Sequence, residues 1–412
     1  MPLALGFGEQ MDLVLFWTSG RSLSSPADEC EDWSLPMCPV PLPIVQGQPS
    51  WPVHASRVKA FVTPVGGHLG PVTFTVGRKK LRPFSVAPWA EEKLPPGSPP
   101  LLKALRGDFF CMPFGGNAAP YRGEKHPPHG ETANATWKLE SLQDGVLHAS
   151  LKTKVRAGRV DKFVRLRPDE ASLYQRHVIS GMSGPMNFGM HMMLRFRSEG
   201  LISTSRFVLG QVLPTPFESA AKGGYQILQA GAHFTRLDRV PRMDGHLADL
   251  SRYPARRGYE DLAMIVADVR LPFAWTAVVF PEEGFLGFTL KDPRVLHQTV
   301  FWNSNGGRHY APWNGRHVDV LGMEEVTAYF DAGIEKSAGR NPISAQGYPT
   351  SVRLSPKTPL VVNTIFAVAA IPRGFDRVES IKAHRSASAV TVTSATGRSI
   401  EVPVDLPFLS GK

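Results

Sequence analysis

Short apolar runs separated by turn-forming residues recur along most of this chain, from Ser56 to Val404. The 412 residues include 38 glycines and 37 prolines, and proline exceeds its usual share of a protein sequence. Short runs of alternating apolar and polar residues between turn formers are typical of strands, and frequent proline excludes long helices. The pattern therefore predicts an all-β fold of antiparallel sheets with few short helices.

Residues 1–52 differ from the rest of the chain. Proline is dense up to Pro52 and no hydrophobic periodicity is present, so we expect a poorly ordered, proline-rich N-terminal extension. Residues 53–412 are then expected to form a single domain, because 42% of the chain is hydrophobic and a sizeable core can be buried. The pattern also predicts three local elements: hairpins over 58–76 and 389–404, and a short helix over 375–384.

The formal net charge of +10 and the isoelectric point of about 9.6 permit an anionic partner, such as a phosphorylated or uronic sugar. Most of the basic residues are scattered. The one tight cluster, Arg78 to Arg82, is interpreted as a solvated turn between strands. Because no nucleic-acid-binding motif accompanies it, we expect no nucleic-acid partner.

The cysteines Cys30, Cys38 and Cys111 have neither metal-ligand spacing nor the number needed for a disulfide framework, which favours a reducing compartment. No apolar run approaches the roughly 20 residues that span a membrane. The short apolar run Met11–Trp17 follows Glu9, where a secretory signal would carry positive charge. We therefore expect a cytoplasmic protein with no membrane partner.

Residues 106–137 hold the densest group of chemically active side chains. In the run HPPHG, prolines exclude helix and bias their neighbours towards extended backbone, so His126 and His129 are expected on a stiff loop or strand end. A stiff polar loop is a plausible floor for a site, since preorganised side chains lose less entropy on binding.

Four segments, in order, resemble galactose mutarotase-like proteins, the aldose 1-epimerase superfamily. They are GGHLGPVTF, PFGGNAAPYRGEKHPPHGETANATW, FGMHMMLRF and NGRHVDVLGMEEV. The resemblance implies a β-supersandwich, a carbohydrate substrate, no cofactor, His191 as catalytic acid and Glu324 as catalytic base. Two features depart from the family pattern. Glu131 stands where its best-known members have a second glycine, and their sugar-binding aspartate loop has no clear match, with Asp244 and Asp249 as guesses.

Interconversion of anomers suits a histidine and a carboxylate. A base takes the proton of the C1 hydroxyl while an acid protonates the ring oxygen, and the roles reverse after the C1 carbonyl has turned over. The pKa values of the two groups can bracket neutrality. We expect His191 and Glu324 to lie across a cavity about one pyranose wide. Glu325 is the reserve base, because alternation along a regular strand allows only one of the two glutamates to enter the cavity.

Six further residues are predicted to contact the sugar. Arginine offers a planar fork of donors to vicinal hydroxyls or an anionic group, and an aromatic face stacks on the C–H face of a sugar. The predicted substrate-binding residues are Asn117, Arg122, His126, His129, Trp313 and His317.

Two alternatives remain open at the level of sequence. His126, His129 and Glu131, completed by His317, contain metal-ligand types and allow a metal-dependent sugar isomerase. A non-catalytic carbohydrate-binding module on the same fold is the other, because fold does not fix function. The main prediction is an isomerase of the aldose 1-epimerase type, acting on an aldose or on an acidic or phosphorylated sugar.

Overall fold

The structure is a computed structural model that describes residues 41–411. Most of the expected N-terminal extension therefore lies outside the described residues, together with Cys30, Cys38 and the Met11–Trp17 run. The expected boundary at residue 52 falls inside strand β3 (Trp51–His54), whose Trp51 is buried. Residues from Leu42 onwards belong to one compact unit, which is the part described below.

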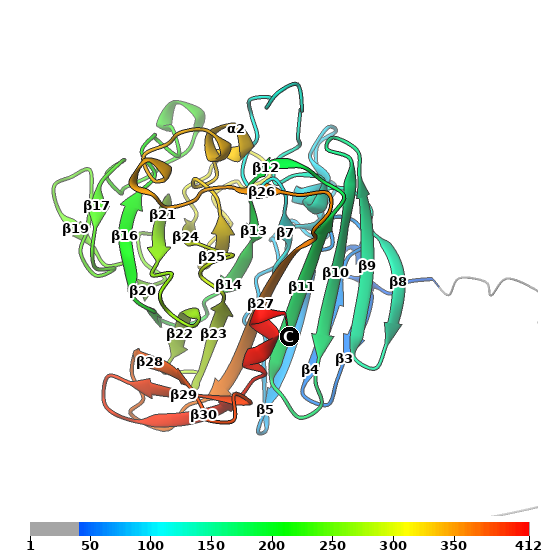
Figure 1. The fold of residues 1–412 in the computed structure, drawn as a ribbon. Helices are drawn as coiled ribbons and strands as arrows, with labels where there is room; N and C mark the ends of the chain where they lie inside the picture. Colours follow the sequence, from blue (N-terminus) through cyan, green and yellow to red (C-terminus); the bar gives the residue numbers. More distant parts are fainter. Residues whose placement is uncertain (1–40, 412) are drawn as a thin grey trace, which may run out of the picture. The chain divides into compact units, whose positions relative to one another are not determined.

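Two large antiparallel sheets make up most of this unit (Figure 1). The nine strands of the first sheet are, in spatial order, β20 (Arg252–Tyr253), β15 (Gly200–Thr204), β22 (Ala274–Phe280), β23 (Phe285–Lys291), β27 (Leu360–Ala370), β11 (Ser172–Ser180), β10 (Gly158–Leu166), β9 (Val146–Thr153) and β8 (Lys138–Gln143). The eight strands of the second sheet are β17 (His233–Phe234), β16 (Phe207–Val212), β21 (Tyr259–Ala267), β24 (Gln298–Asn305), β25 (Val320–Thr327), β13 (Phe188–Met190) and β7 (Phe110–Cys111), with β14 (Met192–Arg195) also paired to β25.

The central strands of the eight-stranded sheet are buried on both faces. On β25, Leu321 and Met323 join the main core cluster, while Val320 and Val326 join a second cluster on the opposite face. The neighbouring strands β21 and β24 divide their side chains between the same two clusters. Because both faces of these strands are buried, a polar side chain lies in the protein interior whichever face of the strand it is on. The candidate site lies among such buried polar side chains.

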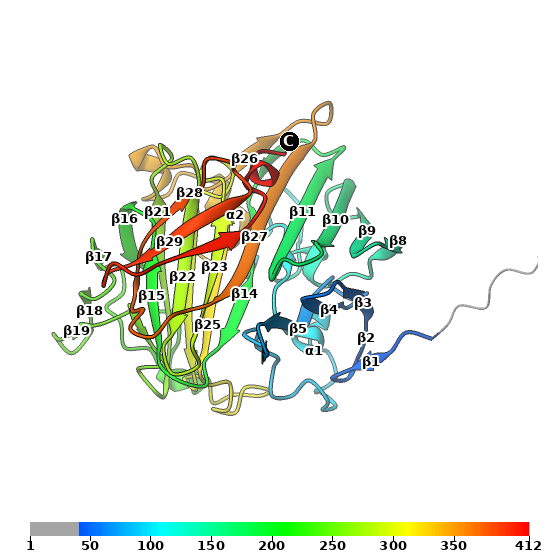
Figure 2. The same cartoon turned by 90° about the horizontal axis from the view of Figure 1, so that it is seen from below.

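Smaller sheets pack on both faces of the nine-stranded sheet, because one of them shares the main core cluster and another shares the third cluster. Figure 2 shows the C-terminal sheet lying against β22, β23 and β27, and the apolar side chains of these strands form a third core cluster. The minor sheets are β3–β6, with β4 (Val58–Val62), β5 (Leu69–Val76) and β6 (Lys79–Leu81); β28 (Val378–Ala383), β29 (Ala389–Ser394) and β30 (Ser399–Pro403); and the pairs β1 (Ile44–Val45) with β2 (Gln48–Pro49), β12 (Gly184–Met186) with β26 (Val352–Leu354), and β18 (Val240–Pro241) with β19 (Leu247–Ala248).

The predicted all-β class is confirmed. Within residues 41–411 the α-helices are α1 (Pro100–Ala104) and α2 (Gly333–Ala338), and neither is long or apolar enough to cross a membrane. Both predicted hairpins form, as β4–β5 and β29–β30. The helix predicted over 375–384 is wrong: strand β28 occupies it, because Val378 and Ile381 must face the nine-stranded sheet.

Candidate functional site

A cavity of about 250 Å³ lies on the outer face of the eight-stranded sheet, away from the core between the two large sheets. This volume is below the roughly 300–1,000 Å³ of pockets for drug-sized ligands, so it suits one small ring. Apolar and aromatic side chains dominate the lining. The lining residues are Pro99, Leu101, Leu102, Leu105, Phe109, Pro128, His129, His191, Phe217, Leu262, Trp302, Arg308, Trp313, Glu324 and Asp331.

The strands bring His191 and Glu324 together through their register. Gly189 pairs with Val326 and Met192 with Met323, so the unpaired positions between β13 and β14 lie opposite the middle of β25. The backbone N–H of His191 turns away from this ladder and donates to the carbonyl of Phe109. The interruption aims the imidazole into the cavity, alongside the carboxyl group of Glu324.

A glycine makes room for that carboxyl group. A Cβ atom at Gly322 would lie 2.8 Å from Oε1 of Glu324 and 2.9 Å from Cβ of Trp302, closer than real Cβ contacts. Only a residue without a side chain therefore fits at this position of β25. Gly322 thus leaves room for the Glu324 carboxyl group, which lines the cavity together with Trp302.

The two groups touch each other, which corrects the expected separation of one pyranose. Nε2 of His191 lies 3.3 Å from Oε1 of Glu324, and both residues are buried. Burial raises the pKa of Glu324 well above its usual value of 4.5 and lowers the pKa of His191 well below 6.5. Both shifts favour the uncharged forms, a carboxylic acid beside a neutral imidazole.

His129 forms one wall of the cavity. Its ring stands edge-on to that of His191, with the ring centres 4.9 Å apart, and burial lowers the pKa of His129 to about 4. Its Nδ1 atom is buried and has no hydrogen-bond partner within the described residues. A buried polar atom without a partner is costly, so it is available to a bound ligand. His129 therefore lines the cavity, and its contact with a sugar stays a prediction.

The opposite wall combines aromatic rings with Arg308. The Arg308 guanidinium lies 4.7 Å from the ring centre of Trp313, 5.4 Å from that of Trp302 and 5.0 Å from that of Phe217. Its Nε donates to Oε1 of Glu218 at 2.5 Å, while its two terminal nitrogens have no hydrogen-bond partner among residues 41–411. The aromatic rings fix the guanidinium, and its terminal nitrogens are free for a ligand.

Asp331 completes the polar lining. Burial raises the pKa of this carboxyl group, and the neighbouring Arg308 opposes that shift. Asp331 also lines a larger outer cavity of about 720 Å³, which shares Phe217, Arg308 and Asp331 with the inner one. The inner cavity is therefore adjoined by a second space that could receive a substituent of a bound ring.

Glu325, the reserve base, points to the other side of β25. Its carboxylate pairs with Lys291 at 2.5 Å in the core between the large sheets. The hydroxyl groups of Thr276, Thr289 and Thr299 also donate to it. A carboxylate with four donors and no cavity cannot exchange a proton with a ligand, so the structure supports Glu324 over Glu325.

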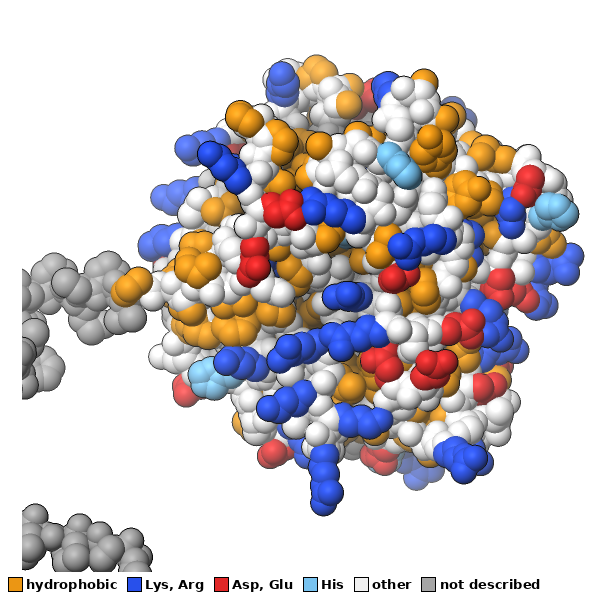
Figure 3. All heavy atoms as spheres, turned by 180° about the vertical axis from the view of Figure 1, so that it is seen from behind, with side chains coloured by type: hydrophobic (Ala, Val, Ile, Leu, Met, Phe, Trp, Pro, Cys, Tyr) orange, Lys and Arg blue, Asp and Glu red, His pale blue; other side chains and the backbone are white. Residues whose placement is uncertain are grey.

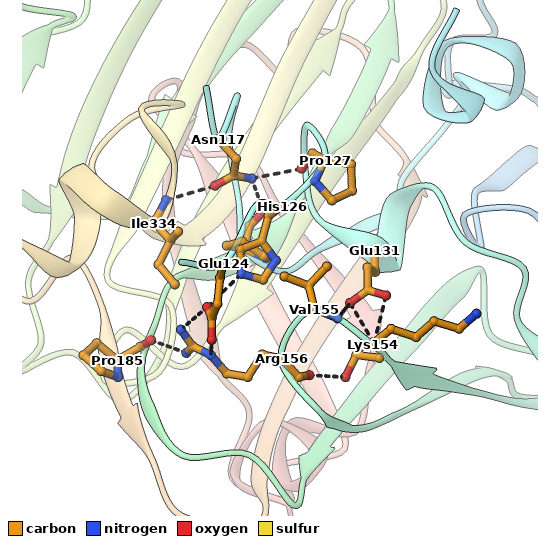
Figure 4. A network of polar contacts seen from close by, with 12 residues as sticks. Asn117, Glu124, His126, Pro127, Glu131, Lys154, Val155, Arg156, Pro185 and Ile334 are labelled. Atoms are coloured by element: carbon orange, nitrogen blue, oxygen red, sulfur yellow. Dashed lines mark hydrogen bonds and ion pairs between the residues drawn. The ribbon is translucent and has the colours of Figure 1, made fainter. Parts of the chain in front are cut away.

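Four predicted sugar contacts do not line the inner cavity. Arg122 is exposed and stacks on Tyr121. Nε2 of His126 lies 3.0 Å from Oε2 of Glu124, and the Glu124 carboxylate also accepts from Arg156 (Figure 4). These contacts hold the loop that carries His129.

Asn117 ties the same loop to α2. Its Nδ2 donates to the Pro127 carbonyl at 3.2 Å and its Oδ1 accepts from the Ile334 N–H at 3.0 Å (Figure 4). His317 lies behind the cavity wall, stacked on Trp302, with Nδ1 2.6 Å from the Ser304 hydroxyl. Neither side chain lines the inner cavity, but Asn117 lines the outer one.

The residues of the metal alternative are not gathered at one point. The Glu131 carboxylate accepts from the backbone N–H groups of Lys154 and Val155 (Figure 4). His126 and His317 have the separate partners given above. Over residues 41–411, no group of three or more His, Cys, Asp or Glu side chains has the geometry of a metal site.

Two cavity residues escaped sequence reasoning, Arg308 and Asp331. Arg308 belongs to the run NGGRHYAPWNG, whose two glycines and following tryptophan signal a loop packed on an aromatic wall. Asp331 follows the end of β25 in YFDAG, close to Glu324 in sequence. The guessed aspartates lie elsewhere: Asp244 pairs with Arg242, and Asp249 accepts from Ser251.

Comparison with solved structures identifies the fold. A galactose mutarotase related enzyme from Lactobacillus acidophilus matches with a TM-score of 0.53 and 11% identity, over 78% of this chain and 97% of that one. The chain has the galactose mutarotase-like fold.

Two other structures agree. A candidate aldose 1-epimerase from Escherichia coli K12 matches with a TM-score of 0.53 and 16% identity, over 78% of this chain and 99% of that one. A galactose mutarotase-like protein from Lactobacillus casei matches with a TM-score of 0.51 and 9% identity, over 77% and 99%. No protein-family model and no curated protein sequence matches the chain. At these identities the likeness extends to the fold alone.

Proposed function

We propose that this protein is an aldose 1-epimerase-like isomerase that interconverts the α and β anomers of an aldose. The observation that carries the proposal is the contact between His191 and Glu324 inside a cavity large enough for one sugar ring. Trp302 and Trp313 line the cavity, and we expect the sugar ring to pack against their aromatic side chains. Structures of the same fold include a galactose mutarotase related enzyme, which supports a sugar as the ligand.

Contact between the two groups suits this reaction. The C1 hydroxyl oxygen and the ring oxygen are bonded to the same carbon. The group that takes the hydroxyl proton and the group that protonates the ring oxygen must therefore lie close together. One group takes the C1 hydroxyl proton while the other protonates the ring oxygen, and the bond between C1 and the ring oxygen breaks. After the carbonyl carbon turns its other face, ring closure returns both protons.

With both groups uncharged at rest, we propose the following first step. A carboxylic acid at Glu324 gives its proton to the ring oxygen, and the neutral imidazole of His191 takes the proton of the C1 hydroxyl. This reverses the roles that the family resemblance implies, and ring closure exchanges them again. His129, Arg308 and Asp331 would bind the hydroxyl groups, or an acidic substituent, that fix the ring between the pair and the tryptophans.

The test is the rate of anomer exchange, followed by polarimetry or proton NMR on freshly dissolved anomers of glucose, galactose, glucuronate and glucose 6-phosphate. We expect acceleration of at least one sugar, and a loss of about 10²–10⁴-fold in His191→Gln. The matched control is the same substitution at the exposed His233, which should keep the wild-type rate.

Two results would overturn the proposal. Sugars that bind saturably without faster exchange would indicate a carbohydrate-binding module. A folded His191→Gln protein with the wild-type rate would remove the proposed role of this histidine.

A further inference from the structure

A second cleft, separate from the sugar cavity, collects basic side chains. It has a volume of about 750 Å³ and lies beside the small sheet β3–β6. Lys59, Arg82, Arg195 and Arg197 line it, and all four are exposed. Lys and Arg side chains form a band across the face of the molecule shown in Figure 3.

The four cations are not neutralised by the protein. Within residues 41–411 none of them forms an ion pair, whereas other exposed arginines, such as Arg236 and Arg252, bind a carboxylate. Two glutamates border the cleft: Glu92 binds Arg316 through both of its oxygens, and Glu91 is the single lining carboxylate left to offset four cations. Unpaired cations in a concave surface concentrate positive potential and attract an anion.

The cations follow one another across adjacent segments. Lys59 of β4 stands opposite Thr73 of β5, and the Thr73 hydroxyl accepts from Nε of Arg82 at 3.1 Å. Next to Arg82, the carbonyl of Pro83 accepts the backbone N–H of Arg195, and Arg197 lies two residues further along. The positive charges therefore form a row, which matches a chain with repeated negative charges better than one small anion.

The other surfaces of the cleft suit a sugar chain. The Lys59 ammonium group lies 5.2 Å from the ring centre of Phe61, which is half-buried in the cleft. The segment 87–92 borders the cleft and also supports the sugar cavity, because Trp89 packs edge-on against Trp313 with ring centres 4.7 Å apart. A polymer in the cleft would therefore lie beside the wall of the sugar cavity.

We propose that this cleft binds an acidic polysaccharide whose repeated carboxylates pair with Lys59, Arg82, Arg195 and Arg197. Arginine binds carboxylates through a planar fork of donors, and the Phe61 ring receives the C–H face of a sugar. The choice of a glycan among polyanions rests on the proposed carbohydrate function. The binding itself is independent of catalysis.

The probe is a polygalacturonate decamer, titrated by calorimetry against the full chain. We expect saturable binding that weakens with added salt, since ionic strength screens exposed charges. Arg195→Gln/Arg197→Gln should bind at least tenfold more weakly. The matched control is Lys357→Gln/Arg385→Gln, which removes two exposed cations away from the cleft that form no ion pair within residues 41–411. It should change the affinity less than twofold.

Three outcomes would overturn the proposal. The first is absence of polygalacturonate binding, or binding that the cleft variant does not weaken. The second is an equal loss in the control variant, which would indicate diffuse charge attraction. The third is tighter binding of a single-stranded DNA decamer, which would make the cleft a nucleic-acid site. Anomer exchange by the cleft variant is measured separately. A negative result for polysaccharide binding therefore does not decide the isomerase proposal, which the exchange assay tests.

Discussion

Glu324 and Glu325 are consecutive residues of one strand, yet their carboxyl groups have opposite surroundings. Glu325 lies between the large sheets with Lys291 as its counter-ion and three threonine hydroxyls as donors. Glu324 lies on the cavity face, and within residues 41–411 its carboxyl group has an ion-pair contact with His191 alone. Both are almost fully buried, so burial alone does not distinguish them.

The difference shows how a strand can hold a structural and a reactive carboxyl group side by side. Burying an ion is tolerated where a counter-ion and hydrogen bonds compensate it, as at Glu325. Without compensation the group becomes neutral and its pKa rises, as at Glu324. Perturbed groups in a cavity are candidates for proton transfer, and Glu324 meets that description while Glu325 does not.

The largest expected effect that separates the two is on catalysis. Glu324→Gln keeps the shape of the side chain and removes its exchangeable acidic proton. We expect anomer exchange to fall by about 10²–10⁴-fold, measured by proton NMR. Glu325→Gln should keep the exchange rate per folded molecule. A wild-type exchange rate in Glu324→Gln together with a large loss in Glu325→Gln would show that the proposed division of roles between the two faces is wrong.

The next effect is on stability and concerns the other face. Glu325→Gln leaves the Lys291 ammonium group buried without a counter-ion, and losing one partner of a buried pair costs about 3–5 kcal/mol. Urea unfolding monitored by circular dichroism measures this loss. The double variant Lys291→Met/Glu325→Leu should recover most of it, because no lone charge remains. A fully stable Glu325→Gln protein would mean that the pair does not support the core.

The fold could be predicted from the sequence further than the site could. Alternating runs and turns are local signals, so the all-β class and both hairpins followed from them. Over 375–384 the local pattern favoured helix, but these residues form strand β28, whose Val378 and Ile381 are buried against the nine-stranded sheet. Local propensity yields to tertiary packing in such cases.

The site depended on contacts between distant segments, which spacing does not reveal. His126 and His129 look alike in HPPHG, yet one binds Glu124 and the other faces the cavity. Their difference arises from the path of the loop, including the positive φ of 57° at His129. The 3.3 Å contact of His191 with Glu324 likewise depends on strand register between residues 133 positions apart in sequence.

The smallest expected effect concerns pH. The folded pKa of Glu324 is raised, so the native protein keeps a proton that the unfolded chain loses above about pH 4.5, and stability falls as pH rises. The folded pKa of His191 is lowered, so the unfolded chain gains a proton below about pH 6.5 that the native protein does not, and stability falls as pH falls. The two trends oppose each other between pH 4.5 and 6.5, and above 6.5 only that of Glu324 remains.

Comparing wild type with Glu324→Gln isolates this trend, because the other titrating groups are common to both proteins. Above pH 6.5 the stability of the variant relative to wild type should rise with pH by up to about 1.4 kcal/mol per unit, until the pH passes the folded pKa of Glu324. Urea midpoints measured from pH 6.5 to 9 give this slope. A flat difference would mean that Glu324 is already ionised in the native protein, and His191 would then be the proton donor of the first step.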